Sequence, residues 1–354
     1  MEALPNPLHT PLCDLLGVRA PIVQTGMGWV ATPELVAAVG EAGAFGFLAA
    51  ATIPPLRVEA AIRDVQERTE RPFGVNFLMD APGADVITDA VVRCRVRAAG
   101  YNRAPDAKLI GRLKDAGVLC IPTCGARRHA EKAEQLGADA IVVQGGEGGG
   151  HTGTVPTSIL VSQAADAVGV PVIAAGGFRD GRGLVAALAF GAAGIAMGTR
   201  FLLTRESPVP QATADRYLAA EVGDVIVSTE IDGLPQRMIV NELVRALESK
   251  GPLGRLLFAL RNALAFRKAT GATIPELLRS ALSMQQHERL TRSQLLMAAN
   301  APMLARRAIS EGDPVGGYLP SGTVAGAIDD RPSCRELVER ILEEAEQTLE
   351  KLGG

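Results

Sequence analysis

The most constraining feature of the sequence is a short apolar run that recurs eight times, each time followed by an Ala-rich stretch of helical character. The runs begin near Pro21, Phe45, Phe73, Cys94, Val118, Asp139, Pro171 and Ala193. A spacing of about two dozen residues is typical of the units of a (β/α)8 barrel, and strands that are apolar throughout are buried on both faces. The sequence therefore predicts an α/β fold with a TIM barrel, with a doubly wound open sheet as the alternative.

The repeat stops after Phe201, and the following residues have a different pattern. Residues 208–320 have helical character interrupted by prolines, which predicts a mostly helical lid or substrate domain. Residues 333–351 carry apolar side chains at helical spacing, so we expect a last helix that packs back on the barrel. The predicted domains are therefore a barrel, formed by residues 10–207 plus 321–354, and a helical domain at 208–320.

Composition and charge exclude several classes of protein. The chain has 354 residues, of which 47% are hydrophobic and 21% charged, so a disordered protein is excluded. A net charge of −3 and 13 aromatic residues argue against a nucleic-acid partner. The longest uncharged apolar run, residues 183–199, is rich in Gly and Ala, which favours a helix, turn and strand over stable membrane insertion.

The cysteines and the start of the chain bear on its compartment. Five cysteines are an odd and sparse set, which fits a reducing compartment rather than a disulfide framework. Cys120 and Cys124 have no second pair of metal ligands at zinc-finger spacing, so no metal is expected. The first residues lack a basic segment followed by an apolar one. The sequence thus predicts a cytoplasmic protein without a metal, and it leaves a homo-oligomer open.

Glycines follow the last two predicted barrel strands. In a (β/α)8 barrel the active site lies at the carboxyl ends of the strands, and the last two loops commonly bind a phosphate through backbone N–H groups. Gly176 and Gly177 follow the seventh strand, and Gly198 and Thr199 follow the eighth. The sequence therefore predicts a phosphate-bearing ligand at these residues, with tight turns at the barrel corners as the alternative.

His151 ends a glycine-rich run beyond the sixth predicted strand. The other three histidines, His9, His129 and His287, lie in polar stretches typical of a solvated surface. Five glycines among residues 145–150, Gly149 and Gly150 included, let the backbone pass close to a flat ligand. A histidine in such a loop can take or give a proton near neutral pH. We expect His151 to be catalytic; the alternative is a loop histidine that is hydrogen-bonded to backbone.

The strand ends together resemble the nitronate monooxygenase family, once called 2-nitropropane dioxygenases, whose members are FMN-dependent TIM barrels. The motifs QTGMGWVATPEL, FGVN, QGGEGGGHTG and AAGGFRDGRGLVAALAFGAAGIAMGTRFLLTRES occur in the family's order, over residues 10 to about 207. A flavin-containing enoyl reductase of fatty-acid synthesis shares the same frame. The resemblance implies a flavoprotein oxidoreductase.

The resemblance also implies roles for matching residues. Gly26 and Met27 would lie beside the flavin ring, and Asn76 and Gln144 would hydrogen-bond FMN. The phosphate of FMN would be held by Gly176, Gly177, Gly198 and Thr199, and Gly149 and Gly150 would also contact the cofactor. His151 occupies the position of the family's catalytic histidine.

Two positions depart from the nitronate monooxygenase pattern. Thr152 replaces an arginine that usually follows the histidine, and Gly26 replaces a proline before Met27. Both bear on the nitronate substrate and not on the flavin. The phrases QTGMGWVA, QGGEGGGHTG, MAANAPML and SGTVAGAIDDRPSC resemble an actinobacterial branch of steroid-ring catabolism. This resemblance implies oxidation, or the reverse reduction, of a cyclic ketone carried on coenzyme A.

Both chemistries require a base next to a flavin. His151 would remove an acidic C–H proton, and N5 of the flavin would accept the electrons. The two hypotheses differ in the partner of the reduced flavin, which is O2 for an alkyl nitronate and NAD(H) for the coenzyme A substrate. A binding module that has lost catalysis and another kind of barrel enzyme are further alternatives.

A basic helical stretch at residues 245–268 bears on coenzyme A. It carries six Lys or Arg residues and one Glu, together with an apolar stripe of leucines. We expect Arg255 and Arg261 to contact the phosphates of a CoA thioester. The alternatives are a solvated basic face and a helix that lies on a membrane surface.

Overall fold

The computed structural model describes residues 6–102, 105–249 and 292–353, and these residues form two compact units. Unit 1 comprises residues 1–148, 152–208 and 328–354, and unit 2 comprises residues 149–151 and 209–327. The chain therefore enters unit 2 for three residues before it returns to unit 1. Among the described residues, no helix is long and apolar enough to cross a membrane.

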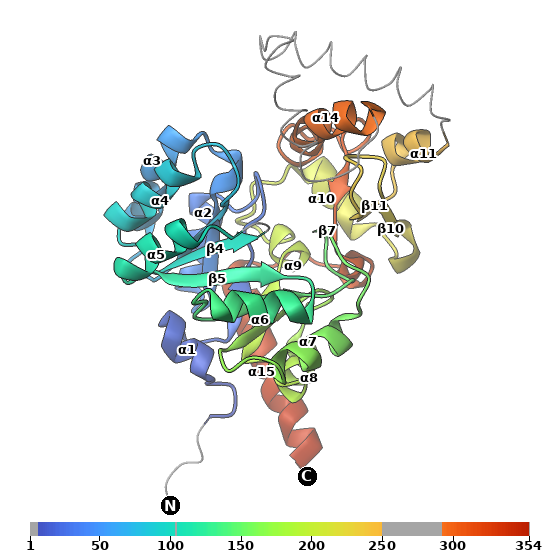
Figure 1. Ribbon diagram of the computed structural model, residues 1–354. Helices are drawn as coiled ribbons and strands as arrows, with labels where there is room; N and C mark the ends of the chain where they lie inside the picture. The colour runs from blue at the N-terminus through green and yellow to red at the C-terminus, as the bar shows by residue number, and fades with distance from the viewer. Residues whose placement is uncertain (1–5, 103–104, 250–291, 354) are drawn as a thin grey trace, which may run out of the picture. The chain divides into compact units, whose positions relative to one another are not determined.

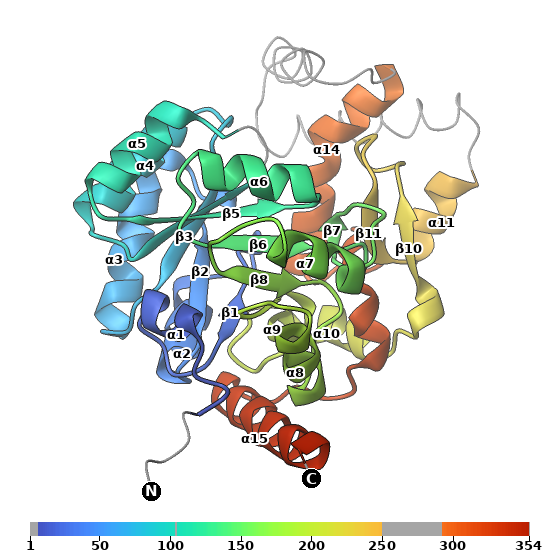
Figure 2. The same ribbon diagram turned by 60° about the horizontal axis from the view of Figure 1, so that its bottom comes forward.

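Unit 1 is a closed barrel of eight parallel strands, as the sequence predicted (Figure 2). The closure of β1 against β9 excludes the open sheet. In order around the barrel, the strands are β1 (Ile22–Gln24), β2 (Phe45–Ala49), β3 (Gly74–Leu78), β4 (Ala98–Asn102), β5 (Leu119–Cys124), β6 (Ile141–Gln144), β8 (Val172–Ala175) and β9 (Gly194–Met197).

Helices that follow the strands cover the outside of the barrel, whereas the first helix precedes the first strand and packs on the barrel interior (Figures 1 and 2). In this unit they are α1 (Pro11–Leu16), α2 (Pro33–Glu41), α3 (Val58–Arg68), α4 (Ala84–Arg93), α5 (Ala107–Asp115), α6 (Arg127–Gln135), α7 (Thr157–Ala165), α8 (Gly181–Ala189), α9 (Thr199–Leu202) and α15 (Cys334–Gly353). The last helix, expected over residues 333–351, packs against α8. Gly181 makes this contact possible, because a Cβ there would lie 2.3 Å from the backbone N of Ala345.

The barrel interior is filled by large side chains that alternate with small ones. Phe45 and Phe47 point inward from β2, with ring centroids 5.2 Å apart in an edge-to-face arrangement. Gly74 leaves room for them, since a Cβ at this residue would lie 2.3 Å from the ring of Phe47. Leu12 and Leu16 of α1 join this cluster, so the barrel is a packed core rather than a channel.

Unit 2 contains a small antiparallel sheet that the sequence reasoning did not anticipate. Strand β11 (Gln236–Ile239) pairs with β10 (Val225–Ser228), β12 (Leu319–Pro320) and β7 (Gly150–His151). The described helices of this unit are α10 (Gln211–Leu218), α11 (Glu242–Glu248) and α14 (Arg292–Ile309). These strands have two to four residues, too few to interrupt a helical pattern in the sequence.

Candidate functional site

The predicted cofactor-binding residues of unit 1 lie at the carboxyl ends of barrel strands. Gly26 lies against β3, because a Cβ on it would be 2.4 Å from the Cβ of Asn76. Gly198 lies against the β1 loop, where a Cβ would be 3.4 Å from Sδ of Met27. The fold thus brings these four residues together at the end of the barrel that carries chemistry in TIM-barrel enzymes.

Gln144 and the glycines after β8 form a second part of the same end. Gln144 ends β6 and pairs with Ala175 in the neighbouring strand β8. Gly176 and Gly177 follow with φ angles of +105° and +83°, a backbone conformation that favours glycine. A Cβ on Gly176 would lie 3.1 Å from the backbone N of Gly148, whereas a Cβ on Gly177 would lie 3.6 Å from its nearest neighbour, Glu147.

These contacts separate glycines required by packing from glycines that leave space. Gly26 and Gly176 face protein atoms so closely that a side chain would collide with them. Gly177 has only ordinary van der Waals contacts, so its surroundings leave its backbone accessible to a ligand. Together with the side-chain amides of Asn76 and Gln144, which both donate and accept hydrogen bonds, these residues suit a flat heterocycle that carries a phosphate.

Glu147 is a residue that the sequence reasoning missed. Its Oε2 accepts hydrogen bonds from the backbone N of Thr157, at 2.9 Å, and from Oγ1 of Thr157, at 2.6 Å. Thr157 is the first residue of α7, so the carboxylate caps the positive end of that helix. The Glu147 carboxylate in the glycine-rich loop is therefore already hydrogen-bonded within the protein. No sequence signal pointed to this role, because Glu147 and Thr157 do not form a standard capping box.

His151 lies in unit 2, where β7 pairs with β11 and His151 stands opposite Gln236. Its side chain is 55% exposed, and its Nε2 lies 2.7 Å from Oδ2 of Asp232. The Asp232 side chain is only 12% exposed. An accessible imidazole beside a carboxylate that is largely shielded from water is an arrangement suited to proton transfer. The glycine-rich run in the sequence indicates His151, whereas no motif indicates Asp232.

Asp232 is held by three donors. Its Oδ1 accepts a hydrogen bond from the backbone N of Leu234 at 3.0 Å, and its Oδ2 accepts from His151 and from Nε2 of Gln236. Burial by itself raises the pKa of Asp232, but these hydrogen bonds outweigh burial and hold the pKa below its ordinary value. The carboxylate is therefore the charged form opposite His151.

The other predicted glycines of the loop also lie in unit 2. Gly149 packs on residues 321–322, because a Cβ on it would lie 2.5 Å from the backbone N of Gly322. Gly150 opens β7 with φ +69°. Thr152, back in unit 1, directs its hydroxyl to the carbonyl of Gly146 at 3.2 Å. Thr152 thus takes part in holding the loop after β6.

Arg255 and Arg261, which were expected to contact coenzyme A, lie outside the described residues. Within the described part of the chain, no group of three or more His, Cys, Asp or Glu residues could hold a metal ion. The five cysteines are buried and free of disulfides, and burial raises the pKa of the Cys120 and Cys124 thiols to about 12. Neither of these two thiols is thus an activated nucleophile.

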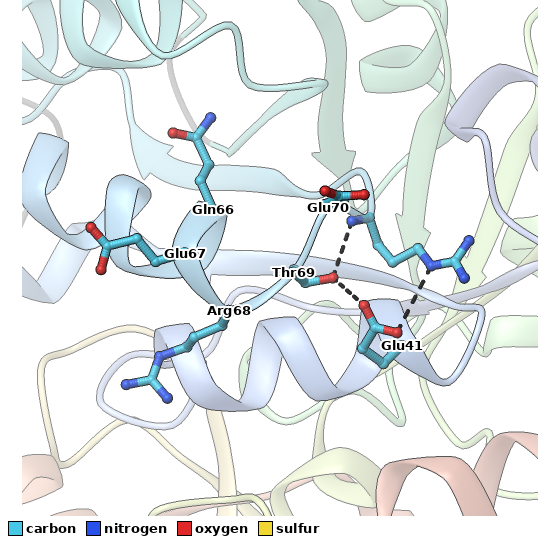
Figure 3. Close-up of a pocket in the computed structure, with 7 residues that line it drawn as sticks. Glu41, Gln66, Glu67, Arg68, Thr69 and Glu70 are labelled. Atoms are coloured by element: carbon cyan, nitrogen blue, oxygen red, sulfur yellow. Dashed lines mark hydrogen bonds and ion pairs between the residues drawn. The ribbon is translucent and has the colours of Figure 1, made fainter.

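A hollow of about 630 Å³ is lined by residues other than those of the candidate site (Figure 3). It is formed by Glu41 and residues 66–71, between the end of α3 and the start of β3. Thr69 links its walls by donating a hydrogen bond to Glu41. Because these residues precede a barrel strand, the hollow belongs to the end of the barrel that serves stability in this fold.

The model of the family described as "Nitronate monooxygenase" matches residues 9–102 and 84–344 of the chain. The chain belongs to the nitronate monooxygenase family. The nitronate monooxygenase family is typically flavin-dependent. Because the chain belongs to this family, it is an enzyme, an oxidoreductase, as the sequence predicted.

Two relatives and one solved structure resemble this nitronate monooxygenase family member along nearly its whole length. Two proteins named "(3aS,4S,5R,7aS)-5-hydroxy-7a-methyl-1-oxo-octahydro-1H-indene-4-carboxyl-CoA dehydrogenase" are similar to it. The protein of Mycobacterium tuberculosis is 50% identical over 96% of each chain, and that of Rhodococcus jostii is 48% identical over 98% of each. The structure of FabK from Thermotoga maritima is 32% identical, with a TM-score of 0.80 over 98% of this chain and 99% of its own.

These similarities confirm two predictions and leave others open. The TIM barrel and the actinobacterial steroid-catabolism branch of the family are confirmed. The individual site residues, the domain boundaries and a homo-oligomer remain predictions.

Proposed function

We propose that this protein is an FMN-dependent dehydrogenase that removes two hydrogens from a bicyclic keto acid carried as a CoA thioester. The observation that carries the proposal is the 48–50% identity, over 96–98% of both chains, to two dehydrogenases named for such a substrate. The exposed imidazole of His151 beside the largely shielded carboxylate of Asp232 supports it, since the reaction needs a base.

The chemistry of a thioester defines the proton that His151 takes. The C–H bond next to the thioester carbonyl is acidified, because its carbanion is stabilised as an enolate. His151 removes this proton, and the adjacent carbon loses a hydride, so that a conjugated C=C bond forms. FMN, when bound, supplies the acceptor for that hydride and is reduced by two electrons. A positioned base of this kind contributes about 10² to 10⁴ in rate.

The barrel residues fit the cofactor by their chemistry. Gly177, Gly198 and Thr199 would hold the phosphate through backbone N–H groups at the loops after β8 and β9. The amides of Asn76 and Gln144 would hydrogen-bond the ring, and Gly26 and Met27 would lie beside it. The contacts of Gly149, Gly150 and Gly176 with FMN belong to the same proposal.

The test is anaerobic mixing of the FMN-loaded protein with the indene-carboxyl-CoA thioester while the visible flavin band is recorded. Bleaching by the thioester, and recovery of the band on addition of NAD+, is the expected result. His151→Ala should slow bleaching by about 100-fold or more, whereas the exposed control His129→Ala should leave it unchanged.

A second candidate, oxidation of alkyl nitronates with O2, is favoured by the family model itself. It predicts that a primary nitronate bleaches the band and that the thioester does not. That result would refute the CoA-thioester proposal, and failure of the protein to bind FMN would refute both candidates.

A further inference from the structure

The contact between His151 and Asp232 determines which nitrogen of the imidazole carries the proton. Neutral histidine has one N–H donor and one lone-pair acceptor on its ring. Two groups approach the same nitrogen, Nε2: the Asp232 carboxylate oxygen at 2.7 Å and the Gln236 side-chain nitrogen at 3.3 Å. The first would require a proton on Nε2, and the second would require a lone pair there.

The carboxylate decides between these two states. A hydrogen bond to a charged oxygen is roughly twice as strong as one between neutral groups, and it is also the shorter contact here. Gln236 has another acceptor for its N–H, because it donates to the same oxygen of Asp232. A lone pair on Nε2 facing the carboxylate would instead be repelled. The contact with the carboxylate therefore favours the proton on Nε2, which leaves Nδ1 as the basic nitrogen of the neutral ring.

We propose that Asp232 is a positioning residue that fixes the Nε2–H form of His151, so that Nδ1 is the atom that takes the substrate proton. This inference rests on the proposed function, in which His151 is the base. After proton transfer the imidazolium faces a carboxylate that is only 12% exposed, so the new positive charge is stabilised where it forms. Asp232 itself remains ionised throughout.

The fold makes this partnership rigid. His151 is in register with Gln236 across the β7–β11 pair, and Gln236 is 2% exposed. Asp232 is fixed at its other oxygen by the backbone N of Leu234. Each carboxylate oxygen thus has a defined donor, and the imidazole is oriented by groups that are themselves held in place.

The substitution Asp232→Asn breaks this arrangement in either orientation of the amide. If the amide nitrogen faces Leu234, it meets a backbone N–H at the site of Oδ1. If it faces His151, it meets donors from His151 and Gln236 and favours a lone pair on Nε2. The second orientation gives the wrong form of the base while leaving the shape of the side chain intact.

The experiment measures the histidine form and the reaction step in parallel. In 15N-labelled, FMN-loaded protein, long-range 1H–15N spectra distinguish Nε2–H from Nδ1–H, and the spectrum of His151→Gln assigns the signals. We expect Nε2–H in the wild type and a shift toward Nδ1–H in Asp232→Asn. Anaerobic flavin reduction by the CoA thioester should slow by about 10²- to 10⁴-fold in Asp232→Asn, with the thioester Kd changed less than about 3-fold.

Two further variants calibrate the result. Asp232→Glu keeps a carboxylate and should retain more of the rate than Asp232→Asn. Glu242→Gln is the matched control, because it makes the same change from carboxylate to amide at an exposed ion pair with Arg216 in unit 2, and it should leave the rate unchanged.

The possible outcomes separate the two hypotheses. If His151→Ala reduces flavin at the wild-type rate, the base assignment in the proposed function is wrong. If His151→Ala is slow but Asp232→Asn is as fast as wild type, the positioning role of Asp232 is wrong and the base assignment survives. A wild-type spectrum with the proton on Nδ1 overturns the inference without any variant, so a failure of Asp232→Asn to fold leaves it testable.

Discussion

Replacing Asp330 by Ala should destabilise unit 1 by about 2–3 kcal/mol, because it leaves a buried guanidinium without its carboxylate. Nη1 of Arg200 lies 2.8 Å from Oδ1 of Asp330, and the Arg200 side chain is 5% exposed. Arg200 follows β9, and Asp330 belongs to the segment before α15, so the pair ties the end of the barrel to the closing part of the chain.

The magnitude follows from the burial of each partner. Breaking a buried ion pair by removing one member typically costs about 3–5 kcal/mol. The Asp330 side chain is 36% exposed, so water screens part of the interaction and the expected cost falls to about 2–3 kcal/mol. Arg200 also keeps a hydrogen bond to the carbonyl of Leu203 at 3.1 Å. For a unit of this size, about 2–3 kcal/mol corresponds to a fall in Tm of about 4–12 °C.

The assay is thermal unfolding followed by circular dichroism, with two comparison variants. Arg340→Ala removes the other, 45% exposed partner of Asp330 and should cost less than about 1 kcal/mol. The double change Arg200→Met with Asp330→Leu removes the buried charge of Arg200 together with its carboxylate partner and should be more stable than Asp330→Ala. Equal Tm values for Asp330→Ala and Arg340→Ala would refute the reasoning.

The pH dependence gives an independent check of the same pair. Burial acts to raise the pKa of Asp330, but Arg340 and Arg200 outweigh it and lower the pKa from its ordinary value of 3.8. A carboxylate with a lowered folded-state pKa stabilises the protein above its unfolded pKa and loses that contribution as the pH falls through the folded one. The difference in stability between wild type and Asp330→Ala should therefore be full at neutral pH and shrink below about pH 3.8.

Three further predictions concern the glycines and the loop after β6. Gly177→Ala places a Cβ on a residue with φ +83°, which costs about 1–2 kcal/mol locally. This variant should weaken FMN binding in a fluorescence titration. The control Gly111→Ala adds a Cβ in open space on α5 and should leave FMN binding unchanged. Glu147→Gln removes the charge that caps α7 at Thr157 and should lower the urea-unfolding free energy by about 1 kcal/mol. Gly181→Ala forces α8 away from α15 and should lower the urea-unfolding free energy by about 1–3 kcal/mol.

The barrel could be predicted from the sequence because its strands are buried on both faces and recur with one period. Glycines at strand ends, such as Gly177, were also visible, because glycine is the residue that permits a positive φ. These signals are local: each can be read within one βα unit without knowledge of the rest of the chain.

Asp232 could not be predicted, because its meaning depends on a contact across 81 residues. In the sequence it is a turn residue, and its bond to Leu234 two positions later is the ordinary use of an aspartate in a turn. The pairing of β7 with β11 was invisible for the same reason, since a two-residue strand carries no periodicity. The roles of Asp232 and of β7 follow from pairing between distant parts of the chain, which residue type alone does not indicate.

Unit 2 is discontinuous along the chain, and this has a consequence for recombination among relatives. A fragment of residues 209–327 alone would include Asp232 and lack strand β7, and so would lack His151. A chimera that exchanges 209–327 between two family members would join a resident histidine to an incoming carboxylate. Histidine and carboxylate are thus encoded in different stretches of the gene, and an exchange that keeps a native pair together carries residues 149–151 along with the larger segment.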